Sequence, residues 1–369
     1  MPTTPQVIDL LIDARWIATV ESDAVLTNHA VAVDKGRILA ILPSGEARAR
    51  FAPGKHVNLP DHILIPGLIN LHTHAAMTLM RGLADDLPLM DWLQKHIWPA
   101  EAAHVSPQFV YDGTRLACAE MLKGGITCFN DMYFYPEAAA AAASEAGMRA
   151  MLGIIALEFP TPYASDADDY LNKGLAVRET WLNDPLIGFC LAPHAPYTVA
   201  DSTFDRILTL SEQLNLPVHC HIHETRQEIE ESLKQHQRRP LERLRQLGQL
   251  GPNFIGVHAV HLDDDDLQLL ASTGCSIAHC PTSNLKLASG FAPVARMRQL
   301  GINVGLGTDG AASNNRLDLF GEMRLASLLA KGLTGDASAL PASEILRMAT
   351  LNAANALGLG KEIGSISPG

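Results

Sequence analysis

The sequence has little of what nucleic-acid-binding, membrane and secreted proteins require. It has 28 lysines and arginines against 40 aspartates and glutamates, and the net charge of −12 disfavours binding to phosphate backbones or anionic membranes. No apolar run approaches the ~18 residues of a membrane span. The N-terminal residues MPTTPQVIDLLIDARW contain neither a cationic segment nor a small-residue cleavage site, so we expect no signal peptide. We expect no nucleic acid and no membrane among the partners.

Cysteine is also scarce, with six residues in the chain and no CxxC pair. In a chain of 369 residues this scatter predicts reduced, mostly buried thiols and a cytoplasmic protein rather than a disulfide framework. The HExxH motif is absent, as is the H-x-E…P-C-x-x-C pattern of the small zinc nucleobase deaminases. The glycine-containing segment VGLGTDGAAS ends an expected strand at an aspartate, so we do not interpret it as a dinucleotide-binding loop.

The composition supports a large folded core, with 47% apolar and 18% charged residues. Residues 1–60 form the first expected domain, because QVIDLLIDARWIATV and HAVAVDKGRILAIL alternate apolar and polar residues and DKGR fits a hairpin turn. This alternation predicts a small antiparallel sheet, and nothing within the segment supplies a partner for its edge.

Residues 61–369 form the second expected domain, in which short β-branched runs alternate with longer helical patterns. Strands that alternate with helices predict a parallel sheet, and eight such units indicate a closed (β/α)₈ barrel, the TIM-barrel fold. The expected fold class is therefore α/β, a barrel with a small flanking β domain. The expected strands are 63–72, 126–131, 149–157, 187–193, 217–222, 254–260, 275–280 and 303–309.

Ionisable residues gather at the ends of these expected strands. In a (β/α)₈ barrel the carboxyl ends of all strands meet on one face, where active sites lie. A random scatter of histidines would not select these places, so we expect a single site there. The residues are His72, His74, His194, His221, Glu224, His258, His279 and Asp309.

A pair of histidines closes the first expected barrel strand. His72 and His74 are two residues apart, so on a strand both side chains point to the same side and can bind one metal ion. The alternative is a pair of hydrogen-bonded core histidines. Their place after LIPGLIN, at the end where barrel sites form, favours the metal pair.

The fifth expected strand carries His219, His221 and His223, which share one face by alternation. A barrel metal centre needs one imidazole here, and we expect it from His221. We expect His219 to be packed more deeply and His223 to lie behind the ligands. Glu224 follows just past the strand, where it can reach a substrate instead of the metal.

Asp309, at the end of the eighth expected strand, adds a carboxylate to three imidazoles. This donor set, with one position left for water, suits one catalytic Zn²⁺ per chain and leaves Fe²⁺ or Mn²⁺ open. Such an ion lowers the pKa of its bound water to about 7 and so makes hydroxide at neutral pH. His258, at the end of the sixth strand, can orient that water, and its alternative role is structural support.

Taken together, these motifs resemble the amidohydrolase superfamily and, more narrowly, the 5′-methylthioadenosine/S-adenosylhomocysteine deaminases. The resemblance runs from about residue 6 to the end of the chain. HxH alone would fit the whole superfamily, whereas the run from HTHAAMTLMRG to DGAASNN narrows it to adenosine-type and related aminohydrolases. The segments that carry it are PGLINLHTHAAMTLMRGLADDLPLMDWL, HIHET, GVHAVHL, AHCPTSNLKLASGFAPV and VGLGTDGAASNNRLDLFGEMRLA.

The resemblance implies hydrolytic removal of the adenine 6-amino group from 5′-methylthioadenosine, with S-adenosylhomocysteine or adenosine as further substrates and ammonia as product. Glu224 would protonate the ring, and His258 would contact the attacking water. Glu101, in IWPAE, would hold the ribose hydroxyls, and His194, in APHAPY, would lie near the substrate. The implied metal ligands are His72, His74, His221 and Asp309, of which Asp309 also takes the proton of the water.

The sequence departs from the family after the third barrel strand. Homologues that accept S-adenosylhomocysteine are expected to present an arginine there to the amino-acid carboxylate. In this chain residues Ala156–Lys173 contain no arginine, and they contain four acids. We expect these acids to repel a carboxylate, so that the methylthio substrate is favoured, unless Arg178 or Arg316 reaches the tail. The acids are Glu158, Asp166, Asp168 and Asp169.

A second departure lies at the end of the chain, EIGSISPG. The family continues beyond this point into strands that complete a small β-sandwich with residues 1–60. We therefore expect the chain to be part of a longer protein. An intact mass of 39.8 kDa for the source protein would contradict this expectation.

Three other functions fit part of the pattern. An aminohydrolase or chlorohydrolase of another heterocycle, such as guanine or a triazine, would share the metal site, and Glu101 together with a panel of ribose-bearing substrates would distinguish it. A non-catalytic metal-dependent binding protein would need a blocked water position. A metal-independent barrel with a Schiff-base lysine would need a lysine at a strand end, and none falls there. The sequence leaves homo-oligomerisation open.

Overall fold

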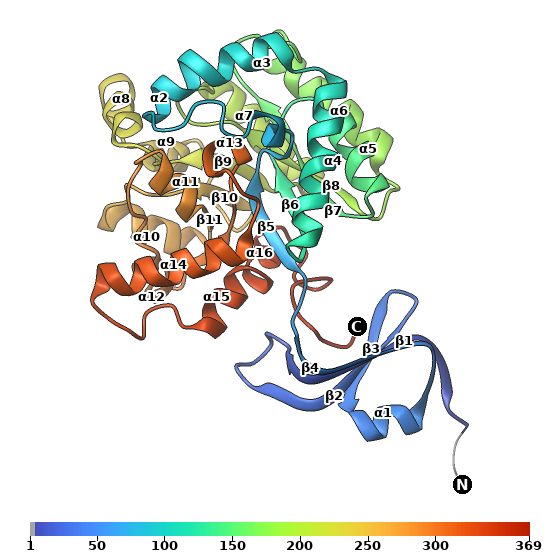
Figure 1. The fold of residues 1–369 in the computed structure, drawn as a ribbon. Helices are drawn as coiled ribbons and strands as arrows, with labels where there is room; N and C mark the ends of the chain where they lie inside the picture. The colour runs from blue at the N-terminus through green and yellow to red at the C-terminus, as the bar shows by residue number, and fades with distance from the viewer. Residues whose placement is uncertain (1–3) are drawn as a thin grey trace.

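The chain folds into a barrel joined to a separate small sheet, as Figure 1 shows for residues 4–369, which the computed structural model describes. The eight barrel strands lie side by side in the order in which they follow one another in the chain, and all neighbouring pairs are parallel. This confirms the predicted (β/α)₈ barrel. The strands are β5 (Leu68–Thr73), β6 (Ile126–Asp131), β7 (Arg149–Ala156), β8 (Ile187–Pro193), β9 (Val218–Ile222), β10 (Phe254–His258), β11 (Ser276–His279) and β12 (Asn303–Leu306).

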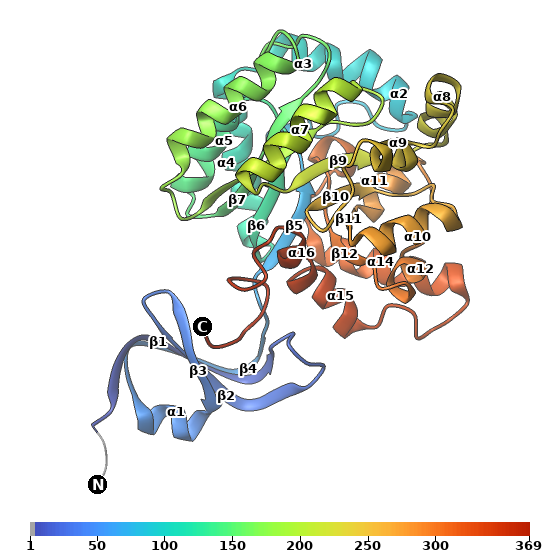
Figure 2. The ribbon, with the colours of Figure 1, turned by 180° about the vertical axis from the view of Figure 1, so that it is seen from behind.

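The barrel strands are buried on both faces, because side chains fill the interior and helices cover the outside. In β5, β9 and β10 every residue is buried, so the polar side chains of these strands, such as Asn70 and His219, are enclosed with the apolar ones. Figures 1 and 2 show the helices as a ring around these strands. The main outer helices are α4 (Pro107–Lys123), α5 (Pro136–Glu145), α6 (Ala167–Trp181), α7 (Asp201–Leu214), α8 (Arg226–His236), α9 (Pro240–Gln246), α10 (Asp264–Thr273), α12 (Val294–Gln299), α14 (Leu319–Thr334), α15 (Ala342–Met348) and α16 (Leu351–Ala356).

Local capping defines where several of these helices begin. The acidic run before α10 acts in this way: the Asp263 side chain accepts from the N–H of Asp266, and the Asp266 side chain accepts from the N–H of Asp263. This capping box satisfies backbone donors that the helix leaves unpaired. The run Asp263–Asp266 is therefore a helix start, where negative charge also interacts favourably with the helix dipole.

The first and last barrel strands meet at a seam between β5 and β12. The Asn70 amide nitrogen donates to the Thr308 hydroxyl at 2.7 Å, and the N–H of Thr308 donates to the Asn70 side chain at 2.9 Å. The N–H of Asp309 donates to the His72 carbonyl at 2.9 Å. Gly307 allows this approach, because a Cβ there would lie 2.9 Å from the backbone of His72. The seam places Asp309 beside the histidines of the first strand.

The long connection between β5 and α4 lies over the carboxyl ends of the strands, at the end of the barrel away from the small sheet (Figures 1 and 2). Its apolar residues, including Trp92 and Ile97, are buried against the barrel core. The elements of this connection are η1 (Ala75–Met80), α2 (Leu89–Trp92), η2 (Leu93–Ile97) and α3 (Trp98–His104).

The small sheet has the strand order β3-β2-β1-β4, formed by β1 (Gln6–Ala18), β2 (Val25–Asp34), β3 (Arg37–Pro43) and β4 (Phe51–Leu64). The pairs β1–β2 and β2–β3 are antiparallel, as predicted, but β4 runs parallel to β1. The reason is α1 (Ser44–Arg50), a helix that was not predicted. It carries the chain across the sheet, as a parallel pair requires.

The two parts of the molecule are linked at both ends of the barrel segment. β4 runs to Leu64, a few residues beyond the expected boundary at residue 60, and leads into β5. After α16 the chain returns to the small sheet, where the N–H of Ile366 donates to the Thr19 carbonyl at 3.0 Å. Ile366 packs there with Ile17 and Val31. Within residues 4–369 no helix combines the length and apolar character needed to cross a bilayer.

We predict opposite effects of alanine at two helical glycines. Gly113 on α4 packs against η1, and a Cβ there would lie 2.4 Å from the backbone oxygen of Ala76. Gly113→Ala should therefore destabilise the protein by ~1–3 kcal/mol. Gly332 on α14 has open space, so Gly332→Ala should stabilise it by ~0.5–1 kcal/mol. Thermal unfolding midpoints of the two variants check this, and a Gly113→Ala midpoint at or above wild type would contradict it.

Candidate active site

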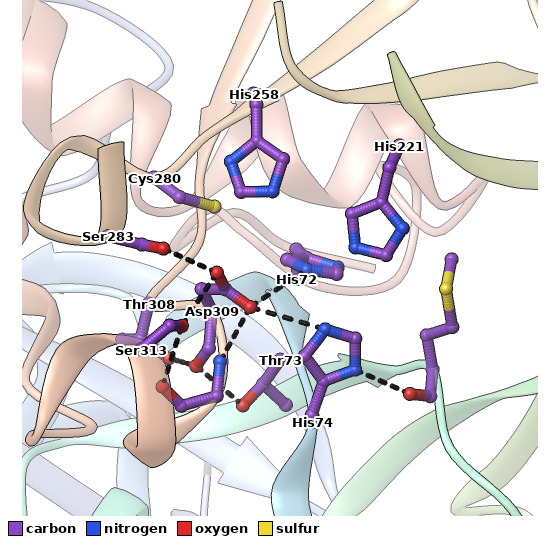
Figure 3. A network of polar contacts seen from close by, with 12 residues as sticks. His72, Thr73, His74, His221, His258, Cys280, Ser283, Thr308, Asp309 and Ser313 are labelled. Carbon is purple, nitrogen blue, oxygen red and sulfur yellow. Dashed lines mark hydrogen bonds and ion pairs between the residues drawn. The ribbon is translucent and has the colours of Figure 1, made fainter. Parts of the chain in front are cut away.

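The carboxyl ends of the barrel strands carry a cluster of imidazoles and one carboxylate (Figure 3). His72 lies in β5 and His74 follows it, His221 lies in β9, His258 ends β10, and Asp309 lies just past β12. The potential ligand atoms form two overlapping trios, His72–His74–Asp309 and His72–His221–His258, and within each trio they lie within 4.8 Å of one another. Barrel closure therefore brings together residues that are far apart in the chain.

The carboxylate of Asp309 lies against two of the imidazoles. Its Oδ1 is 3.2 Å from Nε2 of His72 and 3.3 Å from Nε2 of His74. Its Oδ2 accepts hydrogen bonds from the hydroxyls of Ser283 at 2.6 Å and Ser313 at 2.8 Å. Burial alone would raise the pKa of Asp309, but the two histidines hold it well below its usual range. Asp309 is therefore ionised at neutral pH.

Two of the imidazoles are anchored through the ring nitrogen that faces away from the cluster. Nδ1 of His74 lies 2.6 Å from the Met132 carbonyl, and Nδ1 of His221 lies 2.7 Å from the His194 carbonyl. Because a carbonyl only accepts hydrogen bonds, each Nδ1 carries a proton and donates. This arrangement directs both Nε2 atoms toward the cluster, as the outer partners of metal-binding histidines do.

His72 lies at the centre of the cluster. Its Nδ1 lies 3.0 Å from Nε2 of His219, and its buried Nε2 faces the Asp309 carboxylate at 3.2 Å. Burial lowers the pKa of His72 to about 4 and that of His221 well below its usual range, so both rings are neutral. Neutral imidazoles and a carboxylate that converge on one point fit a divalent metal ion.

His74 differs from the other two imidazoles in its charge. Burial opposes protonation of His74, but the contact with Asp309 outweighs it and raises the pKa to about 9. The proton concerned occupies Nε2, the atom that would face a metal ion. A cation bound at Nε2 of His74 would have to displace this proton.

Glu224 and His258 border both the cluster and the cavity beside it. Oε2 of Glu224 lies 3.7 Å from Nε2 of His258. The N–H of Glu224 donates to the Glu228 carboxylate at 2.8 Å, which fixes the chain just after β9. Burial raises the pKa of Glu224, with the nearby His258 opposing it. A raised pKa favours the protonated form that a proton donor needs.

The alternation expected for the three histidines around β9 ends with the strand. His223 lies past the strand and has a positive φ of 50°, so its side chain does not continue the face of His219 and His221. Its Nδ1 lies 3.2 Å from the His261 carbonyl, and its Nε2 accepts from the N–H of Leu241 at 3.1 Å. His223 therefore holds loops together. His219 is fully buried, and it contacts the cluster from behind through Nδ1 of His72.

A cavity of about 310 Å³ opens from the cluster. Its inner end is polar and its walls are mostly apolar, which suits a flat ring that presents polar atoms at one edge. The connection between β5 and α4 supplies much of the wall. Ionisable residues at the cavity are His74, Glu101, His194, His221, Glu224, His258 and Asp309, and the larger aromatic residues include Trp92, Trp98, Tyr133, Phe134, Phe159 and Tyr197.

Glu101 and His194, the two remaining predicted site residues, both line this cavity. Glu101 lies on α3, and burial raises the pKa of Glu101 to about 7. His194 follows β8, and its Nδ1 lies 2.9 Å from the Thr198 hydroxyl. Burial lowers the pKa of His194 to about 3, so the ring is neutral. The structure thus brings the predicted site residues to the cluster or to the adjoining cavity, except for His279, which lines a separate small pocket beside α14.

The four acids after β7 do not line the cavity, so any repulsion of a bound carboxylate would have to act from outside the cavity wall. The loop instead contributes apolar residues, among them Leu157 and Phe159, to the wall. No lysine or arginine among the described residues lines the cavity, and Arg178 is paired with Glu179. A carboxylate bound here would lack a cation. The acids are engaged elsewhere: Glu158 with Thr203, Asp166 with the N-terminus of α6, Asp168 with Arg206 and Asp169 with Lys173.

Sequence reasoning missed the residues that hold the cluster from behind. Ser283 and Asn284 lie on α11 (Pro281–Lys286), and Ser313 lies on α13 (Ala311–Asn314). Ser283 and Ser313 bind Asp309, and Oδ1 of Asn284 lies 2.8 Å from Nδ1 of His258. The position of these residues in the chain could have indicated them, because both short helices begin shortly after a barrel strand ends.

Comparisons with known proteins identify the family of this chain and agree with its fold. Residues 63–369 match the model of the amidohydrolase family. A 5-methylthioadenosine/S-adenosylhomocysteine deaminase of Saccharophagus degradans is 51% identical over 98% of this chain and 81% of its own length. The crystal structure of an adenosine deaminase from Xanthomonas campestris with bound zinc has a TM-score of 0.97 and 51% identity, over 99% of this chain and 84% of that one.

A more distant structural neighbour shows the fold alone. Atrazine chlorohydrolase from Arthrobacter aurescens, complexed with zinc, has a TM-score of 0.90 at 23% identity, over 98% of this chain and 85% of that one. Its overall backbone is therefore similar, while its identity is too low to carry an activity to this chain.

We predict that each chain binds one divalent metal ion and that the His221→Ala variant binds this ion much more weakly. His221 is a proposed direct ligand, so its loss should cost more than the ~10- to 100-fold in affinity typical of an outer partner, and both the ion and the activity should be lost. Metal content after dialysis, measured by mass spectrometry of the metal, checks this. His62→Ala, an exposed residue on β4, is the matched control and should retain the ion. Full metal content in His221→Ala would contradict the assignment.

Proposed function

Because this chain belongs to the amidohydrolase family and, within it, to the 5-methylthioadenosine/S-adenosylhomocysteine deaminases, we propose that it removes the 6-amino group of adenine from 5′-methylthioadenosine. Water adds at C6, ammonia leaves, and a 5′-methylthioinosine-type product remains. Adenosine and S-adenosylhomocysteine carry the same ring and are further candidate substrates. The observation that carries the proposal is the convergence of Asp309, Glu224 and His258 at the inner end of an apolar cavity.

We propose Zn²⁺ as the ion, held by His72, His74, His221 and Asp309. The buried Nε2 of His72, which faces the Asp309 carboxylate, and the anchoring of the other two rings through Nδ1 support this donor set. Three imidazoles, a carboxylate and one open position are typical of catalytic zinc, and the similar adenosine deaminase from Xanthomonas campestris is a zinc complex. When bound, such an ion lowers the pKa of a water to about 7 and supplies hydroxide at neutral pH.

The neighbouring residues divide the proton transfers between them. Asp309, ionised and fixed by two serine hydroxyls, accepts a proton from the attacking water. His258 orients that water through Nε2. Glu224, whose burial favours the protonated acid, donates to N1 of the purine, so that negative charge does not accumulate on the ring as C6 becomes tetrahedral.

Glu101 and His194 bind the rest of the nucleoside in this proposal. Glu101 is an acid among apolar and aromatic residues of α3 and its neighbours, where two ribose hydroxyls would satisfy it. Neutral His194 borders the same cavity and can hydrogen-bond a ring nitrogen of the purine. Glu101 also separates this proposal from a guanine or triazine hydrolase, because such substrates have no ribose.

The residues of the cavity also argue against a Schiff-base enzyme and against a protein that only binds. A Schiff-base mechanism requires a lysine, and none of the described residues that line the cavity is one. A purely binding role would not explain why Glu224, Asp309 and His258 lie together at the inner end of the cavity. The six buried thiols support a cytoplasmic location as part of the proposal.

An ammonia-release assay of the zinc-loaded protein tests the function. The substrates to compare are methylthioadenosine, S-adenosylhomocysteine, adenosine and guanine. We expect ammonia from the adenine nucleosides, because they present both the 6-amino group and the ribose. Release from guanine alone would overturn the proposal.

We predict that Glu224→Gln retains metal and fold but loses about 10²- to 10⁴-fold in kcat. Glutamine has nearly the same shape, but it cannot donate a proton to N1. Kinetics on the zinc-loaded variant, with metal content measured in parallel, check this. Glu230→Gln, an exposed residue on α8, is the control and should behave as wild type. A Glu224→Gln enzyme with a tenth of the wild-type rate would show that another group protonates the ring.

We predict that methylthioadenosine has a kcat/KM about tenfold or more above that of S-adenosylhomocysteine. The two substrates share adenine and ribose, so Glu224, His258 and Glu101 act on them alike. They differ in a charged amino-acid tail, and a carboxylate without a cation at the cavity mouth costs several kcal/mol to desolvate. Competition between the two substrates in one assay measures the ratio directly. Equal efficiencies would mean that the tail stays in water or finds a cation outside the cavity wall.

A further inference from the structure

The two ring nitrogens of His258 face different residues. Nδ1 lies 2.8 Å from Oδ1 of Asn284, and Nε2 lies 3.7 Å from Oε2 of Glu224. His258 and Asn284 are 1% and 2% exposed, so water does not compete for this contact. A neutral imidazole carries one proton, and the partner of one nitrogen therefore decides whether the other carries a proton or a lone pair.

Asn284 is held rigidly on α11. Its N–H donates to the Cys280 carbonyl at 3.0 Å, and its own carbonyl accepts from the N–H of Ser289 at 2.8 Å. The preceding residue, Ser283, donates to Asp309. Two consecutive residues of one helical turn thus hold two groups of the proposed reaction, Asp309 and His258.

The backbone of His258 is also constrained, in a conformation that non-glycine residues rarely adopt. His258 has φ 71° and Ala259 has φ 47°. Hydrogen bonds from the N–H of Ala259 to the Ile222 carbonyl at 3.1 Å and from Val260 to the His223 carbonyl at 3.0 Å hold this turn. Strained backbone of this kind persists at sites where the surroundings fix it. The turn sets the position of the Cβ atom, and a side-chain contact is still needed to set the ring.

We propose that Asn284 is the positioning residue for His258. Its side-chain carbonyl accepts the Nδ1 proton, which fixes the rotation of the ring and leaves the Nε2 lone pair directed at the cavity, where the attacking water and Glu224 lie. Asn284 itself does not line the cavity and touches no substrate. The inference rests on the proposed function, because it assigns His258 the task of orienting the water.

Two substitutions of Asn284 separate positioning from a structural role. Asn284→Ala removes the acceptor, and we expect kcat to fall by about 10- to 100-fold with KM within twofold and one zinc ion per chain. Asn284→Asp keeps an oxygen in the same place, and we expect it to recover most of the lost kcat. Asn303→Ala is the control, because Asn303 on β12 is an asparagine that loses two side-chain hydrogen bonds, to Ser276 and Asn352, where Asn284 loses one, and it does not touch His258.

A second measurement is independent of the substrate. In ¹⁵N-histidine spectra, with the His258 signals identified by their loss in His258→Gln, we expect the proton on Nδ1 in the wild type and a mixture of tautomers in Asn284→Ala. A wild type with its proton on Nε2, an Asn284→Ala enzyme with wild-type kcat, or an Asn284→Asp enzyme as slow as Asn284→Ala would each overturn the inference. If the wild type releases no ammonia from any nucleoside, the proposed function fails, and the spectra still decide the role of Asn284.

Discussion

The contact between Asp309 and the histidines of β5 is the interaction on which the site depends. A carboxylate that is 4% exposed is costly to bury, and it remains ionised here because two imidazoles and two serine hydroxyls surround it. These partners come from β5 and from the segments after β11 and β12. The network therefore exists only when the first and last strands of the barrel meet. The ligand cluster is therefore complete only in the closed barrel.

The seam that joins these strands has a steric requirement of its own. Gly307 lies so close to His72 that a Cβ would press on its backbone, while Asn70 and Thr308 hydrogen-bond across the gap. Small and polar residues thus replace the apolar packing found elsewhere in the barrel. This local exception to the apolar pattern places a carboxylate within 3.3 Å of two imidazoles.

Two kinds of segment, the strand ends and the connections between elements, supply the residues that line the cavity. Strand ends supply the polar inner end, where positions are rigid, and the connections supply most of the wall, where sequence can vary without disturbing the barrel. The connection between β5 and α4 brings Trp92, Trp98 and Glu101 over the strand ends. The loop after β7 brings Phe159. Selectivity among substrates that share one reacting ring therefore belongs to these connections and not to the metal cluster.

The barrel was predictable because each strand has a local signature, an apolar run followed by a polar end, and the closed topology places those ends together. For this reason His72, His74, His221, His258 and Asp309 could be assigned to one site before any distance was known. The small sheet was less predictable. Alternation identifies strands but not their direction, and the seven-residue α1 reverses the direction expected of β4.

The sequence by itself thus determined the order of the elements and the chemical groups at their ends, because both follow from local sequence patterns. Only the tertiary structure decided which of those groups act on one another. It turned His223 away through a positive φ, placed His219 behind His72, and engaged the acids after β7 with α6 and α7 instead of the cavity. It also set Asn284 against His258. Such pairings depend on angstrom-scale packing between segments that are distant in the chain. They therefore cannot be predicted from local periodicity.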